Sequence, residues 1–251
     1  MNNITIQEEY TLPSMGQIYA KPFDPTVKLR SMTTVEEMKR LTVTESPFKS
    51  MSEIIDDCIV NKLPMSVYDL CLGDYQYLLH KLRVVTYGPE YAFGVTCPFC
   101  GESFDGKFSL DELDVHTYDS SVDELSVIEL PVSKNIIKLK FQTPRILDNI
   151  EKRKKAMKQQ FPDMTEDPTL MLNIESVIDT IDGEPVNPAT IQTYIKKLSM
   201  RDTNLILNRA RKMNEKVGVD TRVTFSCPNC ARDIITPFRF TSDFWRPEVD
   251  S

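Results

Sequence analysis

The chain carries two C-P-x-C motifs, Cys97-Pro98-Phe99-Cys100 and Cys227-Pro228-Asn229-Cys230, which are far apart in the sequence. Two cysteines separated by two residues can direct both sulfurs at one point. Two such pairs therefore supply the four thiolates of a tetrahedral Zn²⁺ site. We expect Cys97, Cys100, Cys227 and Cys230 to hold one structural zinc ion per chain. This site constrains the fold because it must bring two distant segments together.

Segments rich in β-branched and aromatic residues flank both motifs. Residues 90–96 and 102–110 surround the first motif, and residues 219–226 and 233–240 surround the second. Such segments on either side of a short turn predict a β-hairpin. We therefore expect a split zinc ribbon made of two hairpin knuckles, with the intervening chain inserted between its halves.

The spacing leaves an alternative open for these cysteines. Common zinc ribbons place roughly 15 to 20 residues between their pairs, far fewer than here, so two independent structural or redox pairs remain an alternative. A thioredoxin-like motif would begin a helix within a βαβ unit, whereas β-prone residues flank both motifs here. A disulfide within either motif would be strained. Cys58 and Cys71 lie in apolar helical patterns and are predicted to be small buried residues.

Composition indicates a globular chain that does not bind nucleic acid. The chain has 251 residues, of which 41% are hydrophobic and 27% charged, and this is enough to bury a sizeable core. A zinc-ribbon protein that binds nucleic acid and regulates transcription is an alternative function. The net charge of −7 disfavours it, because nucleic-acid-binding surfaces are basic. The basic run 152–155 is predicted to be a solvated helix face.

Two further absences concern location. No apolar stretch is long enough to span a membrane, and the N-terminal residues lack the pattern of a signal peptide. Reduced thiols with metal-ligand spacing are typical of a reducing compartment, so we expect a cytoplasmic protein.

Hydrophobic periodicity predicts an α+β fold in which helices are combined with the ribbon. A strand is expected over 27–30, an acidic loop over 111–125, and a hairpin from 126–130 and 136–141. Thr33 or Thr34 should cap the first helix, with Glu36 or Glu37 in its first turn. The predicted helices cover residues 33–41, 50–60, 66–87, 144–160, 170–181, 187–198 and 201–217.

These elements suggest four consecutive units. Residues 1–90 would form an extended arm plus a helical segment, and 91–125 the first half of the ribbon with the acidic loop. Residues 126–218 would form a hairpin and a helical insertion, and 219–251 the second half of the ribbon with an aromatic tail.

No catalytic constellation is visible. The two histidines are His80, in an apolar helical pattern, and His116, in the acidic loop. There is neither a Ser-His-Asp context nor a glycine-rich phosphate loop. Four cysteine ligands would leave no coordination position open for water, which indicates a structural zinc rather than a catalytic one. We therefore expect a protein that is not an enzyme.

The C-terminal tail is aromatic, with Phe238, Phe240, Phe244 and the single tryptophan, Trp245. Aromatic residues are enriched at interface hot spots, so Phe240, Phe244 and Trp245 could bind a partner protein. The alternative is that the tail folds back and joins the core.

Short motifs follow one another in a distinctive order. The N-terminal half contains Leu12-Pro13-Ser14-Met15-Gly16-Gln17-Ile18-Tyr19, Met32-Thr33-Thr34-Val35-Glu36-Glu37, Ile55-Asp56-Asp57-Cys58-Ile59, Leu72-Gly73-Asp74 and Leu82-Arg83-Val84-Val85-Thr86-Tyr87-Gly88. The C-terminal half contains Ile181-Asp182-Gly183 and Gly218-Val219-Asp220 before the second C-P-x-C. This order resembles the baseplate hub proteins of T-even-type contractile-tailed bacteriophages, a group of hub subunits and hub-assembly factors.

The resemblance implies a non-enzymatic viral protein that is present in the host cytoplasm during assembly. It implies that the protein binds other baseplate hub and tail proteins, and either stays in the virion or leaves as an assembly chaperone. The four cysteines are the positions carried over as metal ligands. Neither a membrane nor a specific nucleic acid is expected as a partner.

Overall fold

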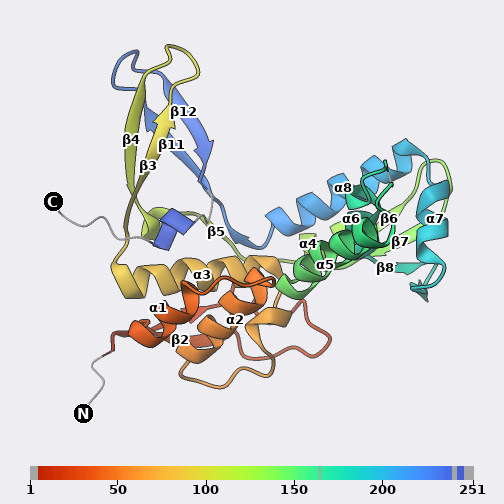
Figure 1. The fold of residues 1–251 in the computed structure, drawn as a ribbon, viewed down its shortest axis with the longest axis horizontal. Coiled ribbons are helices and arrows are strands. Elements are labelled where there is room, and N and C mark those ends of the chain that lie inside the picture. Colours follow the sequence, from red (N-terminus) through yellow and green to blue (C-terminus); the bar gives the residue numbers. More distant parts are fainter. Residues whose placement is uncertain (1–4, 164, 239–241, 246–251) are drawn as a thin grey trace.

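Helix α3 (Leu72–Tyr87) is the element around which the other parts of the chain are arranged (Figure 1). The computed structural model describes residues 5–163, 165–238 and 242–245. Within these residues, helices are combined with small antiparallel sheets and the two C-P-x-C motifs lie close together, which confirms the predicted fold class. No helix among them is long and apolar enough to cross a membrane.

An N-terminal lobe packs along one side of α3 (Figure 1). Its first two strands pair antiparallel, and Thr33 caps its first helix in a capping box with Glu36, as the sequence predicts. The core of the lobe is apolar and includes Leu12, Leu29 and Ile55, all fully buried. Its elements are β1 (Gln7–Thr11), β2 (Thr26–Arg30), α1 (Thr34–Arg40) and α2 (Pro47–Cys58).

The prediction of one continuous helix over 66–87 was wrong. A short 3-10 helix (Val67–Asp69) comes first, and Leu70 and Cys71 are extended before α3 begins. The Cys71 sulfur accepts a hydrogen bond from the Asp74 N–H at 3.4 Å and so caps the helix. Side-chain capping of this kind competes with helix continuation. Gly88, with φ of +88°, ends α3 as expected.

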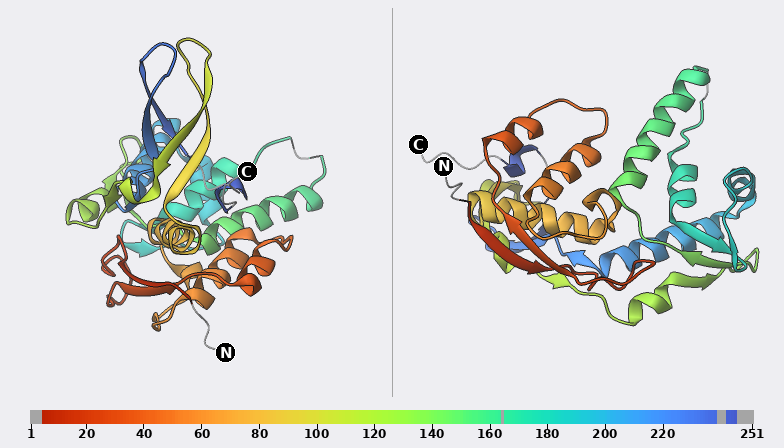
Figure 2. Two further views of the ribbon diagram at one scale, coloured as in Figure 1. Left: turned by 90° about the vertical axis from the view of Figure 1, so that its left-hand side faces the viewer. Right: turned by 90° about the horizontal axis from the view of Figure 1, so that it is seen from below.

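A middle region extends beyond the N-terminal end of α3 and contains a four-stranded antiparallel sheet (Figures 1 and 2). The predicted hairpin forms β6 and β7, and α5 has the predicted bounds. The strands are β6 (Val127–Glu129), β7 (Ile136–Leu139), β8 (Ile178–Ile181) and β9 (Glu184–Pro185). The helices are α5 (Pro144–Gln160), α6 (Thr169–Val177), α7 (Ile191–Lys197) and α8 (Met200–Glu215).

Three local predictions in this region need correction. The helix expected over 170–181 ends at Val177, because residues 178–181 pair with β7 as a strand. The helix expected from Asn187 begins at Ile191, since the Asn187 side chain instead accepts from the Ala189 N–H in a turn. Ser199 caps α8, so this helix starts before Arg201.

The acidic segment 111–125 is more ordered than the expected loop. It contains β5 (Val115–His116), which pairs with β10 (Gly218–Val219), and the short helix α4 (Ser121–Ser126). The β5–β10 pair connects the chain after the first hairpin to the chain before the second. Both hairpins therefore leave the body of the protein from neighbouring positions.

Candidate metal centre

Two β-hairpins project together from the body of the protein, side by side in Figures 1 and 2. The first consists of β3 (Glu90–Thr96) and β4 (Ser103–Ser109), and the second of β11 (Arg222–Ser226) and β12 (Asp233–Pro237). Each forms its own antiparallel two-stranded sheet. The hairpins predicted on either side of both C-P-x-C motifs are thus present, and each motif lies at a hairpin tip.

The two tips have the same backbone turn. The Gly101 N–H donates to the Cys97 carbonyl at 3.0 Å, and the Ala231 N–H donates to the Cys227 carbonyl at 2.9 Å. The residue after each second cysteine has a left-handed backbone conformation, with φ of +77° at Gly101 and +54° at Ala231. Glycine adopts this conformation without a steric penalty, whereas alanine does not. The second tip therefore has the backbone of the first with a less suitable residue.

All four cysteine sulfurs gather at one point between the tips. They lie within 4.8 Å of one another. Two of these approaches join the two hairpins, at 3.7 Å from Cys97 to Cys230 and 3.6 Å from Cys100 to Cys227. Tetrahedral zinc with Zn–S bonds of about 2.3 Å places its sulfurs about 3.8 Å apart, whereas a disulfide requires about 2.05 Å. The arrangement is compatible with a metal site and includes no disulfide.

The acid–base properties of the cluster also favour a cation. Burial raises the pKa of Cys97. The N–H groups of Phe99 and Cys100 and the neighbouring thiols outweigh that effect and lower the pKa to about 7. The Arg232 N–H lowers the pKa of Cys230, but burial and the three other cysteines raise it, to about 11. Four thiolates this close repel one another unless a cation neutralises them.

A small apolar core lies beneath the sulfurs and joins the hairpins. It contains Val95, Phe225 and Ile234, with Phe93 and Phe108 packed against it. Phe225 of β11 makes edge-on ring contacts with Phe93 and Phe108 of the first hairpin, at 5.6 and 6.1 Å. The contact between the hairpins thus rests on a few aromatic rings in addition to the cysteines.

The aromatic tail lies at the base of the ribbon. Phe244 is fully buried and Trp245 is 6% exposed, both within the core of the N-terminal lobe. Buried Arg83 of α3 donates to the Phe244 carbonyl at 3.0 Å. This burial favours the alternative in which the tail joins the core, and partner binding by these residues stays a prediction. Phe240 lies outside the described residues.

Other residues considered from the sequence lie far from the sulfur cluster in the fold. Cys58 and Cys71 are buried, as predicted. His80 is buried in α3, and its desolvation lowers its pKa to about 4, so it is neutral at pH 7. His116 lies in β5, where its ring bonds to the Glu215 carbonyl at 2.8 Å. No hydrogen bond between a histidine and a nucleophilic side chain is present in the described part of the chain.

Sequence reasoning missed two residues that shape the centre. Ala231 takes the left-handed position, and the glycine at the matching place after Cys100 was the available signal. Gly106 of β4 lies against the Phe225 ring. Nothing in the local sequence indicates that contact, because Phe225 belongs to the other half of the ribbon.

Comparison with known families identifies one match. A family model described as T4 bacteriophage base plate protein matches residues 3–245, so the match includes both hairpins and everything between them. No curated protein and no solved structure matches the chain.

Proposed function

The chain belongs to the T4 bacteriophage base plate protein family, and from this membership we propose that it acts in the baseplate hub. In this proposal the protein is a hub subunit or an assembly factor for the hub. It works through contacts with other hub and tail proteins in the host cytoplasm while the baseplate is built. Family membership by itself supports a non-enzymatic phage baseplate protein, and the hub role is the more specific proposal.

The extent of the family match is the observation that carries this proposal. Because residues 3–245 match, the N-terminal lobe, the middle region and the ribbon all fall within the family pattern. The resemblance in the order of short motifs supports the hub in particular. A nucleic-acid regulator is disfavoured by the net charge of −7. Independent redox pairs are disfavoured because the sulfurs of both hairpins gather in one cluster, within 4.8 Å of one another.

We further propose that the four cysteines bind one zinc ion per chain and that its role is structural. Four thiolates satisfy a tetrahedral ion completely and leave no position for substrate or water. The ion would hold together two hairpins that share only a small apolar core. Because a structural site of this kind does not form in the unfolded chain, metal binding would contribute directly to folding stability.

The hub role can be tested in a phage whose gene for this chain carries a premature stop codon. We expect infected cells to accumulate incomplete baseplates, visible by electron microscopy, and the wild-type gene supplied in trans to restore tails. Normal tails without the protein would contradict the proposal. Mass spectrometry of purified virions then separates the two hub roles, because a subunit is present in them and an assembly factor is absent.

A further inference from the structure

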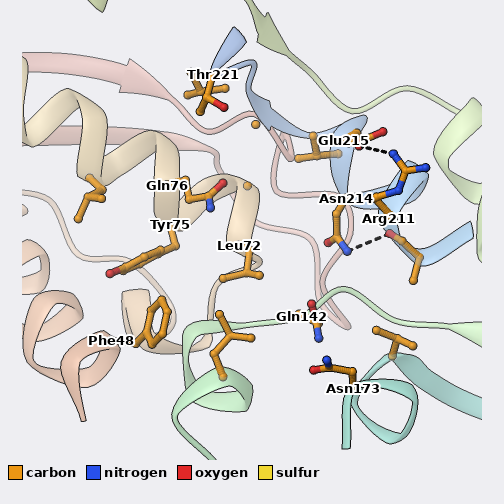
Figure 3. A pocket seen from close by; sticks show the side chains of 18 of the residues that line it. Phe48, Leu72, Tyr75, Gln76, Gln142, Asn173, Arg211, Asn214, Glu215 and Thr221 are labelled. Atoms are coloured by element: carbon orange, nitrogen blue, oxygen red, sulfur yellow. Dashed lines mark hydrogen bonds and ion pairs between the residues drawn. The ribbon is translucent and has the colours of Figure 1, made fainter. Parts of the chain in front are cut away.

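A groove of about 780 Å³ separates the N-terminal lobe from the middle region (Figure 3). Helix α3 lines one side, α8 lines the opposite side, and parts of α5 and α6 close the third. Gly73 of α3 and Gly218 of β10 line the groove where these parts of the chain meet. A Cβ on Gly73 would lie 2.1 Å from the Val217 carbonyl oxygen. Two of the short motifs that carried the family resemblance, Leu72-Gly73-Asp74 and Gly218-Val219-Asp220, thus meet at this groove.

Most of the uncharged polar side chains that line the groove are carboxamides. Figure 3 shows Gln76 on the α3 side, across from Gln142 and Asn173. Gln142 donates to the Ser176 hydroxyl at 2.7 Å, which leaves its oxygen available. The side chains of Gln76 and Asn173 make no hydrogen bond to other described residues, and both are partly exposed. Hydrogen-bonding capacity is therefore left over on both sides of the groove.

The groove is electrically neutral although the chain has a net charge of −7. Its only charged lining residues within the described chain are Arg211 and Glu215 of α8, which pair with each other at 3.0 Å. The remaining walls are largely apolar and include Phe48, Leu72 and Leu147. Among the described lining residues there is no unpaired cation for a phosphate or a carboxylate, and no cluster of carboxylates for a metal ion. These walls suit an uncharged, partly apolar occupant.

We propose that this groove binds a short, extended and uncharged segment of another tail protein. A carboxamide offers both a donor and an acceptor, which is what a peptide backbone needs from its partner. The apolar side chains of the segment would lie against the apolar walls, and its backbone would bond to Gln76 and Asn173. This inference extends the proposed function, because it assigns the surface and the kind of partner through which the protein would act.

Binding of the purified protein to an immobilised library of short uncharged, acidic and basic peptides tests the groove alone. We expect uncharged apolar peptides to be retained, and Gln76→Leu to weaken their binding roughly threefold to tenfold. The melting temperature of this variant should not fall, because the Gln76 side chain makes no hydrogen bond within the described chain. The matched control is Asn204→Leu, on an exposed part of α8 outside the groove, which should leave binding unchanged.

Several results of that experiment would overturn the inference. A purely apolar occupant would bind the Gln76→Leu variant more tightly than the wild type. Selection of charged peptides, or retention of none, would contradict a neutral peptide site.

Gln76→Trp, which fills the groove, tests the same surface during phage assembly. We expect the wild type and Asn204→Leu to restore tails to a phage lacking the gene, and Gln76→Trp not to restore them although it melts normally. Normal tails with Gln76→Trp would overturn the groove inference and leave the hub proposal standing. Normal tails without any copy of the protein would instead refute the hub proposal, and the peptide experiment would then decide the groove by itself.

Discussion

The ring of Phe225 in β11 lies directly over Gly106 in β4, so that a Cβ at position 106 would be 2.7 Å from the ring Cζ atom. This contact joins the two halves of the ribbon, which the sequence separates by more than a hundred residues. Gly106→Ala should force the hairpins apart and reduce the free energy of unfolding by about 1–3 kcal/mol, as overpacking typically does. Thermal melts of the wild type and the variant, purified in the same way, measure the effect.

Gly94 of β3 provides the matched control for this variant. It lies in the same hairpin, and no atom of the described residues lies within 4 Å of the Cβ that an alanine would add there. Gly94→Ala should therefore be neutral or slightly stabilising, because a glycine inside a strand costs conformational entropy. Equal melting temperatures for the two variants would show that the hairpins do not pack as described.

The turns at the two hairpin tips predict opposite effects of exchanging glycine and alanine. Ala231→Gly should stabilise the protein by about 1 kcal/mol, because it removes a left-handed non-glycine residue. Gly101→Ala introduces that strain at the other tip and should destabilise by about the same amount. Within the part of the chain that the structure describes, no atom lies within 4 Å of a Cβ at position 101, so the effect of the change there is on backbone conformation alone. Urea unfolding checks both variants, and shifts of the same sign would contradict the shared turn.

Asp148 of α5 connects the middle region to the N-terminal lobe. Its carboxylate accepts from the Lys49 N–H at 2.9 Å, in the first turn of α2, and from the Tyr68 hydroxyl at 3.0 Å. The Ser46 side chain makes no capping bond there, so Asp148 supplies the cap from another part of the chain. Asp148→Ala should lower the free energy of unfolding by about 1–3 kcal/mol, because it leaves the buried Tyr68 hydroxyl without its acceptor.

Glu151→Ala, on the same helix, is the control for Asp148→Ala. Glu151 is exposed and makes only a loose pair with Lys154 at 3.4 Å. Its loss should change stability by no more than about 0.5 kcal/mol. Chemical denaturation of the two variants under identical conditions measures the contrast, and similar costs would argue against the capping role of Asp148.

The capping box of α1 predicts a stability contribution that acid removes. Arg30 lowers the pKa of Glu36 from 4.5 to about 2, with help from the Thr33 hydroxyl and N–H, although burial opposes the shift. A depressed carboxyl pKa stabilises the folded state above pH 4.5, and this contribution is lost as the pH falls from 4.5 towards about 2. It should be on the order of 3 kcal/mol at pH 7.

Comparing the wild type with Glu36→Gln isolates that contribution. The wild type should be the more stable protein at pH 7, and its advantage should shrink in urea unfolding at acidic pH. Loss of the proposed metal in acid would affect both proteins alike, so the difference between them reports on Glu36. An advantage that does not change with pH would show that the Glu36 charge contributes nothing.

Much of the fold could be predicted because its signals are local. The C-P-x-C pairs, the Thr33 capping box and the proline at the start of α5 each act within a few residues. Strand β8 was mistaken for the end of a helix because its pairing with β7 depends on residues about forty positions away. An apolar run of this length fits a buried strand as well as a buried helix, so periodicity alone cannot separate them.

The motifs that carried the family resemblance can be found in the sequence alone, but the contacts they make in the fold cannot be predicted from it. Asp74 accepts from the Ser14 N–H at 2.9 Å and from the Tyr19 hydroxyl at 2.6 Å, so two motifs from different parts of the chain meet at one buried carboxylate. In the same way, Gly73 and Gly218 meet where α3 contacts β10. These relationships depend on tertiary contacts, which a single sequence does not display.

Metal analysis of the purified native protein tests most directly whether the four cysteines bind zinc. Elemental analysis should give about one zinc ion per chain, and chelation should lower the melting temperature sharply, because metal binding contributes to folding. A protein that contains no metal and melts at the same temperature with and without chelator would contradict the split zinc ribbon.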